Sequence, residues 1–310
     1  MKSYKTSALF LTTLTILTIS SCTTDDTDDT YDDSDHSHID ITNSIFTQRS
    51  ANCATYDNSY EAMVTDIQES KNFDLDVVIT ISEDDCRIVS NNIPNHDFND
   101  DTAHFATKVS EANKSFTISQ SPQIANSTTA ISQRYYDGVM LNGVVIDIQS
   151  AGCYSPNEPM ADSDGNVPSG CDASSWLTDP LSSDSSFGAD NHNAHTQPDG
   201  TYHYHGNPEA MFDDNPGSDG SPVIGFAADG FPIYGSYFYD GSSVRKATSS
   251  YQIKTGTRGT RSDTNPGGDY TGLYVDDYEY IENHGDLDEC NGMTIDDQYG
   301  YYVTDTYPWI

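Results

Sequence analysis

Short stretches in which apolar and polar residues alternate recur along this chain. One begins at Phe73 and runs through β-branched residues to Ile81, and another extends from Lys114 to Ser121. Alternation with a period of two residues is typical of strands that bury one face. No long segment shows the 3.6-residue period of an amphipathic helix, so the pattern predicts an all-β fold.

Two segments predict β-hairpins. Residues 138–147 place Asn142-Gly143 between apolar runs, which is the strongest short-range hairpin signal. Residues 224–235 repeat this form around Asp229-Gly230, although Pro232 restricts the second arm to an edge or a bulge. With a last strand at 299–304, we expect a single sandwich- or barrel-like domain with long turn-rich loops over residues 45–310. A small N-terminal module that ends near residue 90 is a weaker alternative.

The start of the chain predicts a lipoprotein signal peptide at residues 1–21. Lys2 and Lys5 precede an apolar run, and Leu17-Thr18-Ile19-Ser20-Ser21-Cys22 resembles a lipobox, in which Cys22 is lipidated. Residues 22–44 are then expected to form the lipidated cysteine and a disordered acidic linker. No other run reaches the roughly 20 apolar residues of a membrane span. We therefore expect an outer-membrane protein that is anchored by its N-terminal lipid, palmitate included, and faces either the cell surface or the periplasm.

Acidic residues dominate the charge of the chain. Lys and Arg total 13 against 49 Asp and Glu, which gives a formal net charge of -36. Such a field repels nucleic acid, so we expect no nucleic-acid partner. The charge is most simply a solvated surface and does not by itself indicate a binding site.

Five cysteines follow Cys22, and in an oxidising compartment they should be mostly paired. One odd cysteine and three ways of pairing the other four give fifteen arrangements. Nearness in the sequence favours two pairs and leaves Cys290 free. The candidate disulfide cysteines are Cys53 with Cys86 and Cys153 with Cys171.

Residues 190–206 hold four of the nine histidines. The run Tyr202-His203-Tyr204-His205 reads as a strand, so His203 and His205 should share one face. A turn at Pro198-Asp199-Gly200 would bring His195 beside them. Three imidazoles suit Zn(II) or Cu(II). The alternative is that these are half-buried strand residues that ordinary hydrogen bonds satisfy.

A second, weaker metal signal is the segment Asp162-Ser163-Asp164-Gly165-Asn166. It places oxygen ligands at positions one, three and five, as a calcium loop does, but Ala173 stands at position twelve, where a Glu is expected. Such spacing arises easily in a chain rich in Asp, so calcium is a low-ranking prediction.

The segment His195 to Gly206 resembles the signature of the YHYH domain family. Further matching segments are 92–96, 138–147, 224–235 and 287–292, so that the resemblance runs from about residue 90 to the C-terminus. It adds His96 and Asp229 to the candidate metal site. His96 is implied as a fourth ligand or a supporting residue, and Asp229 as a carboxylate ligand or the acceptor that orients an imidazole. The resemblance implies no particular activity.

Three functions follow as hypotheses. The first is a cell-envelope lipoprotein with a histidine-centred Zn or Cu site. The second is a metal-free surface module that binds glycans or another extracellular small molecule, in which some of the 21 Tyr, 11 Phe and 2 Trp would lie exposed in a row. The third is a hydrolase in which Asp229 holds a histidine base, although no Gly-x-Ser-x-Gly nucleophile motif is present. Catalytic residues and oligomeric state stay open.

Overall fold

The computed structural model describes residues 38–172, 175–185 and 187–310, which belong to one compact unit. The predicted signal peptide, the predicted lipidation site Cys22 and most of the predicted linker lie outside the described residues. Within the described part, strands alternate with turns and irregular loops, and the helical elements are the short 3-10 helices η2 (Cys53–Tyr56) and η3 (Val275–Asp277). The all-β prediction is confirmed.

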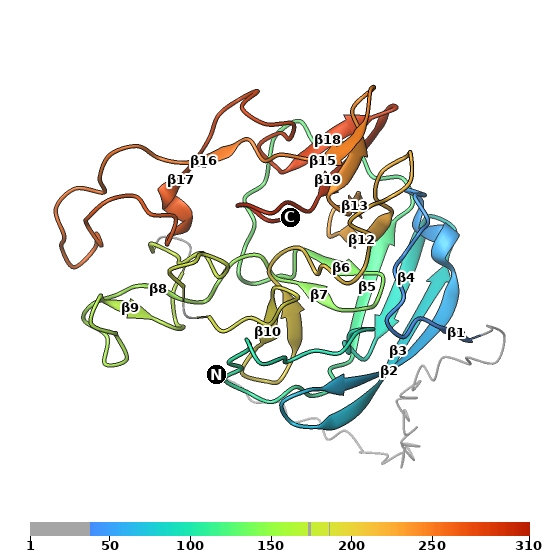
Figure 1. Ribbon diagram of the computed structural model, residues 1–310, viewed down its shortest axis with the longest axis horizontal. Helices are drawn as coiled ribbons and strands as arrows, with labels where there is room; N and C mark the ends of the chain where they lie inside the picture. Colours follow the sequence, from blue (N-terminus) through green and yellow to red (C-terminus); the bar gives the residue numbers. More distant parts are fainter. Residues whose placement is uncertain (1–37, 173–174, 186) are drawn as a thin grey trace, which may run out of the picture. The chain divides into compact units, whose positions relative to one another are not determined.

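The first sheet is a five-stranded layer in the strand order β1-β2-β3-β4-β5. Neighbouring strands from β2 to β5 are antiparallel, whereas β1 runs parallel to β2. In Figure 1 the strands β2 to β5 lie side by side in blue and green. The bounds are β1 His38–Asp40, β2 Asn58–Asp66, β3 Lys71–Ile81, β4 Asp85–Ser90 and β5 Lys114–Ser119.

The second sheet has eight strands in the order β10-β11-β7-β6-β12-β13-β19-β18. Most neighbours are antiparallel, but β11 runs parallel to β7 and β13 runs parallel to β19. The bounds are β6 Gly138–Met140, β7 Val145–Ile146, β10 Ala194–Thr196, β11 Tyr202–Tyr204, β12 Val223–Ala227, β13 Pro232–Tyr234, β18 Gly292–Ile295 and β19 Gln298–Tyr302.

Three two-stranded pairs lie outside these sheets. They are β8 (Cys153–Tyr154) with β9 (Asn166–Val167), β14 (Tyr237–Tyr239) with β15 (Val244–Lys246), and β16 (Tyr251–Ile253) with β17 (Tyr278–Tyr280). Within the described ranges, no helix is long and apolar enough to cross a membrane.

One hydrophobic core joins the two sheets. The inward residues of the first sheet, such as Val77, and those of the second, such as Phe226, belong to the same buried cluster. The turn of the β6–β7 hairpin shows how closely the layers approach. Gly143 has a φ of +78°, and a Cβ there would collide with the side chains of Ser90 and Val77. The Asn-Gly signal therefore reflects both a left-handed turn and close packing.

Both predicted hairpins are present. Strand β6 pairs with β7 around Asn142-Gly143, and β12 pairs with β13 around Asp229-Gly230. The sequence predicts that the fold starts at residue 45, but the structure has a strand before it. Strand β1 begins at His38, within the stretch predicted as linker, and pairs with β2. Ile41, which follows β1, is buried in the core. The acidic composition of this stretch predicted a linker, but strand pairing uses backbone groups, which composition does not reveal.

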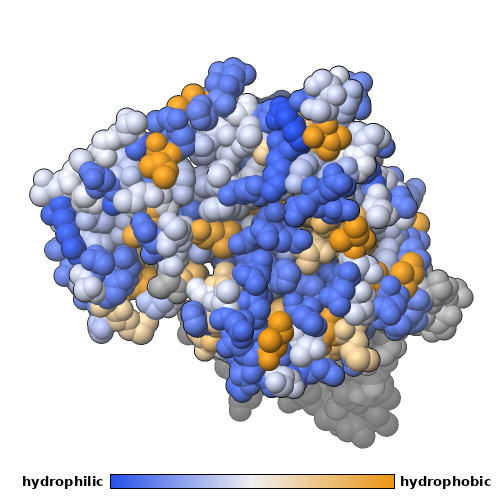
Figure 2. Space-filling model, in the orientation of Figure 1, coloured by the Kyte–Doolittle hydropathy of each residue, from blue (hydrophilic) through white to orange (hydrophobic). Residues whose placement is uncertain are grey.

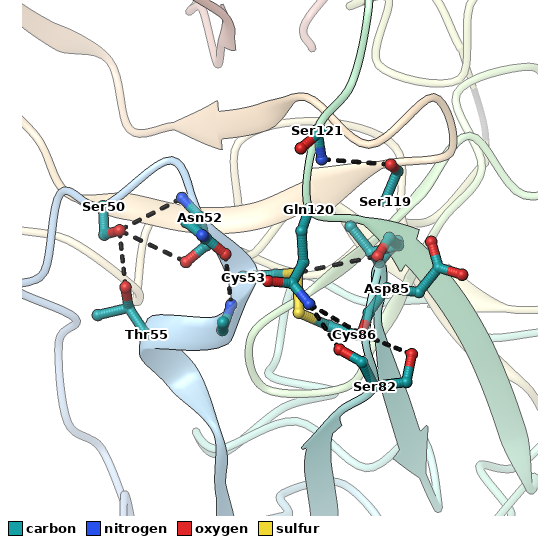
Figure 3. Close-up of a disulfide and its surroundings, with 12 residues drawn as sticks. Ser50, Asn52, Cys53, Thr55, Ser82, Asp85, Cys86, Ser119, Gln120 and Ser121 are labelled. Atoms are coloured by element: carbon teal, nitrogen blue, oxygen red, sulfur yellow. Dashed lines mark hydrogen bonds between the residues drawn. A yellow bond between two sulfur atoms is a disulfide. The ribbon is translucent and has the colours of Figure 1, made fainter.

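Two disulfides link the pairs of cysteines that nearness in the sequence favoured. Cys53 bonds to Cys86, and Cys153 bonds to Cys171. Figure 3 shows the first of them, which ties η2 to the strand β4 between two groups of hydrogen-bonded serine and amide side chains. Cys290 is a free, partly buried thiol. The predicted pairing is confirmed.

The visible surface is largely hydrophilic. Figure 2 shows hydrophobic residues on this face only as small separate groups among polar residues. This distribution agrees with a chain whose formal net charge is -36, since charged side chains remain solvated at the surface.

Candidate metal centre

The hairpin formed by β10 and β11 carries the candidate site. The two strands pair antiparallel, and the register places His195 directly opposite His203. The turn between them closes where the N–H of Gln197 donates to the carbonyl of Thr201, with Gly200 at a φ of +88°. The prediction that a turn brings His195 back beside His203 is confirmed.

Alternation along β11 separates the histidines from the tyrosines. His203 and His205 contribute to one cluster of rings, while Tyr202 and Tyr204 turn into the core. The Tyr202 hydroxyl donates to Asp190 over 2.8 Å. Both tyrosines are fully buried, so the strand is held firmly on the side opposite the histidines.

The three imidazoles converge through their Nε2 atoms. The Nε2 of His205 lies 3.0 Å from that of His203 and 2.9 Å from that of His195. All three potential ligand atoms lie within 4.8 Å of one another. His203 and His205 are buried, and His195 is partly exposed. The geometry is that of three donors around one point.

Backbone carbonyls fix two of the rings. The Nδ1 atom of His195 lies 3.1 Å from the carbonyl oxygen of Phe187, and the Nδ1 atom of His203 lies 3.2 Å from that of Thr201. A carbonyl oxygen only accepts, so each Nδ1 must carry the hydrogen. Each Nε2 then points an unprotonated lone pair toward the centre, which is the arrangement that supports metal-bound histidines.

His205 cannot satisfy both neighbours. A neutral imidazole carries one N–H, so its Nε2 can donate to either His195 or His203 but not to both. Its buried Nδ1 has no hydrogen-bond partner of normal geometry. A bound cation would satisfy all three lone pairs at once. Three imidazoles alone leave at least one polar atom unpaired, which is costly in a buried site.

Burial keeps the cluster neutral. It lowers the pKa of His203 to about 3, and the charge of His195 adds to this effect. Burial also lowers the pKa of His195 and takes the pKa of His205 well below its usual range, with repulsion from His203 as the next cause. Neutral imidazole is the form that binds metals. At neutral pH the site therefore needs no deprotonation before it binds an ion.

His96 lies on the opposite side of the hairpin from this cluster. Its Nε2 contacts the Tyr204 hydroxyl at 2.6 Å, and its Nδ1 contacts the carbonyl of Asp97 at 2.9 Å. Both ring nitrogens are thus occupied. The ring packs against the tilted ring of His192, with 3.8 Å between centroids and 41° between the ring planes. The structure does not bring His96 to the other three histidines, so the predicted role as a fourth ligand is replaced by a structural one.

Asp229 is also separate from the cluster. It lies in the turn after β12, and its carboxylate accepts a hydrogen bond of 2.5 Å from the hydroxyl of Tyr301. Neither metal ligation with the histidines nor orientation of an imidazole is seen for this side chain. The resemblance implied that Asp229 contacts a metal or an imidazole, whereas its partner in the structure is a tyrosine of β19.

The predicted calcium loop is held by its own side chains. Asp162 accepts from the backbone N–H groups of Asp164 and Asn166, at 2.9 and 2.8 Å. The side-chain oxygen of Asn166 accepts from the hydroxyl of Tyr274. Within the described residues, these carboxylates do not join a group of three or more potential metal ligands.

Several residues near the cluster carried no sequence signal. Phe187 packs its ring on His195 and His205, at centroid distances of 5.3 and 6.1 Å, in addition to its carbonyl contact. Gln197, two residues beyond His195, donates to Asp147 over 2.9 Å. Burial, with the charge of Asp137 as a second cause, raises the pKa of Asp147 to about 7. A backbone carbonyl and a loop aromatic are not recognisable as site residues from their types alone.

His96 and His192 line a separate cavity of about 490 Å³. Asp97, Asp100 and Glu209 contribute acidic groups to its wall, and the remaining lining residues are Asn43, Ile45, Ile67, Asn191 and Ala210. Histidines therefore lie against both faces of the hairpin. The converging cluster is on one face, and His96 and His192, from segments outside the hairpin, line an open acidic cavity on the other.

The comparisons with known proteins identify the domain. A model of the YHYH protein family matches residues 115–310. This match begins later than the predicted start near residue 90, although residue Asn92 from upstream still donates to the carbonyl of Tyr202 over 2.7 Å. Comparison with curated proteins and with solved structures found no match. Because the family model covers more than half of the chain, including the complete histidine hairpin, the protein belongs to the YHYH family.

Proposed function

We propose that this protein is a cell-envelope lipoprotein whose YHYH domain binds one transition-metal ion through His195, His203 and His205. The observation that carries the proposal is the convergence of three Nε2 atoms with contacts of 2.9 and 3.0 Å. Two of the rings are fixed by carbonyl groups so that their lone pairs face the same point. An all-imidazole donor set favours Zn(II) or Cu(II) over calcium or magnesium.

Elemental analysis tests this proposal. The full chain, purified without a histidine tag, should contain about one equivalent of zinc or copper, as the single converging donor set implies. The double variant His203→Ala/His205→Ala should contain none. The variant His192→Gln is the matched control, because it removes a histidine that is close in the sequence but packs on His96 outside the cluster. Equal metal content in the parent and the double variant, or no metal in the parent under metal-replete conditions, would refute the proposal.

The envelope location rests on the N-terminal sequence. Lys2 and Lys5, an apolar run and the lipobox-like segment before Cys22 support lipid attachment. Metabolic labelling with a palmitate analogue should label the parent chain in the membrane fraction, whereas Cys22→Ala should lose the label. Digestion of intact cells with a protease then separates the cell-surface location from the periplasmic one.

A second candidate function is capture of a small extracellular molecule. The cavity of about 490 Å³ beside His96 and His192 favours it over a glycan platform. The large aromatics that are exposed among the described residues are Tyr135 and Tyr239, at 76% and 47%. They come from different segments and do not form the row that stacking on a glycan requires. This candidate predicts ligand binding that survives loss of His203 and His205.

The hydrolase hypothesis receives less support. It needs a histidine base held by Asp229, but that carboxylate contacts Tyr301. The free thiol of Cys290 is a poor nucleophile, because burial and the nearby charge of Asp288 raise its pKa. A metal-independent hydrolytic site is therefore not proposed.

A further inference from the structure

The histidine cluster offers three protein donors for an ion that binds four or more ligands. Among the residues that the structure describes, no further histidine, cysteine, aspartate or glutamate joins the group. Structural zinc sites are closed by a fourth protein ligand, whereas sites that act on exogenous molecules keep one position free. The composition of this cluster is that of the second kind.

The contacts of His205 set two of the three angles at the ion. Bonds from zinc to histidine nitrogen are about 2.0 to 2.1 Å long. The Nε2 atom of His205 lies 2.9 Å from that of His195 and 3.0 Å from that of His203, so the bond to His205 would meet each of the other two bonds at about 90°. These angles are narrower than those of a tetrahedral site with four protein ligands, which leaves room on the ion for another ligand.

The rings cannot easily move to close the site. Carbonyl groups of Phe187 and Thr201 hold the Nδ1 atoms of His195 and His203. The backbone N–H of His205 donates to the carbonyl of Asn193 across the hairpin. Since His203 and His205 are each only 2% exposed while His195 is partly exposed, access to the ion lies on the side of His195.

Charge then decides which ligand the open position takes. Three neutral imidazoles contribute no negative charge to the coordination of the 2+ ion, and charge without a direct counterion is costly in a buried site. An anion at the free position removes most of this cost. The ring of Phe187, at 5.3 Å from the His195 ring and 6.1 Å from the His205 ring, restricts the space beside the cluster, so the anion must be small.

We infer that the metal centre has an open coordination position that binds one small anion. The inference rests on the proposed metal binding by His195, His203 and His205. It makes the centre an exchangeable ligand site and not a structural clamp on the hairpin.

Cobalt substitution with azide as the probe tests this inference. The full chain loaded with one equivalent of Co(II) should show visible absorption bands from coordinated cobalt. Addition of azide should shift these bands in a saturable way, with one azide per cobalt. His192→Gln should behave like the parent chain, and His203→Ala/His205→Ala should give neither the bands nor the shift.

A second variant tests the predicted size limit. In Phe187→Ala the carbonyl contact to His195 is retained, but the ring beside the cluster is removed. Benzoate should shift the cobalt bands in this variant and leave those of the parent chain unchanged. Cobalt bands that azide does not alter would overturn the open position while leaving metal binding intact. Absence of cobalt binding to the parent chain would overturn both.

Discussion

Histidines lie against both faces of the β10–β11 hairpin, yet their chemistry differs. On one face His195, His203 and His205 turn their Nε2 atoms toward a common point. On the other face both ring nitrogens of His96 are hydrogen-bonded, one to the Tyr204 hydroxyl and one to the carbonyl of Asp97. Burial alone does not distinguish them, because His96 and His203 are each nearly inaccessible, at 3% and 2% exposure.

The difference lies in the partners of each ring nitrogen. A buried histidine with two hydrogen-bond partners is complete and has no lone pair for a metal. In the cluster, backbone carbonyls take the Nδ1 hydrogens of His195 and His203, and the Nε2 of His205 can donate to only one of their two remaining lone pairs. The comparison indicates that the hydrogen-bond partners of each ring nitrogen distinguish a candidate metal site from a structural histidine better than the number of histidines does.

The largest expected effect is a gain in stability when metal binds the cluster. At a free zinc concentration of about 100 times the Kd, the free energy of unfolding should rise by about 2.7 kcal/mol. The comparison predicts this gain for the parent chain and for His192→Gln, and no gain for His203→Ala/His205→Ala. Urea unfolding with and without zinc measures it. An equal gain in the double variant would place the zinc elsewhere.

The pH dependence of stability should reveal the structural role of His96. Burial, with the charge of His192 as a second cause, lowers the pKa of His96 to about 3, against about 6.5 in an unfolded chain. Between these values the unfolded chain binds more protons, so His96 makes folding less favourable as the pH falls below about 6.5.

Comparison with His96→Gln isolates this contribution, since other titrating groups are common to both chains. Relative to the variant, the metal-free parent chain should lose about 2 kcal/mol of unfolding free energy between pH 7.5 and pH 5. Urea unfolding of both chains at the two pH values measures this difference in unfolding free energy. A difference between the two chains that does not change with pH would mean that His96 is not held neutral.

The smallest expected effect comes from Tyr204→Phe. The hydroxyl of Tyr204 contacts His96 and accepts from Asn142 over 3.0 Å. Its loss should lower the free energy of unfolding by about 1.5 kcal/mol, because two buried polar groups lose a partner. Metal content should stay at about one equivalent, since the hydroxyl lies on the face away from the cluster. Loss of metal in this variant would show that the two faces are coupled.

The sequence predicts the cluster well because its geometry is local. Alternation puts His203 and His205 on one face, and a short turn returns His195 to them. The same local logic predicted the hairpins around Asn142-Gly143 and Asp229-Gly230. These features depend on residues close in the chain, for which periodicity and turn chemistry are reliable guides.

The remaining features depend on long-range packing. His96 reaches Tyr204 across 108 residues, and a resemblance to a family does not tell on which side of the hairpin such a residue will lie. The parallel pairing of β11 with β7, and of β13 with β19, is equally non-local. The carbonyl of Phe187 acts through the backbone, so its residue type gives no signal. Strand β1 pairs with β2 while its own side chains stay exposed. With no buried face to mark it, this strand is not recognisable from the sequence of the acidic segment that contains it.

Anomalous scattering from a crystal of the zinc-loaded chain tests the central claim most directly. The account predicts one strong zinc peak at about 2.0 to 2.1 Å from the Nε2 atoms of His195, His203 and His205, and none beside His96 and His192. A zinc peak in the acidic cavity, or a loaded crystal in which the three Nε2 atoms surround no anomalous scatterer, would contradict it.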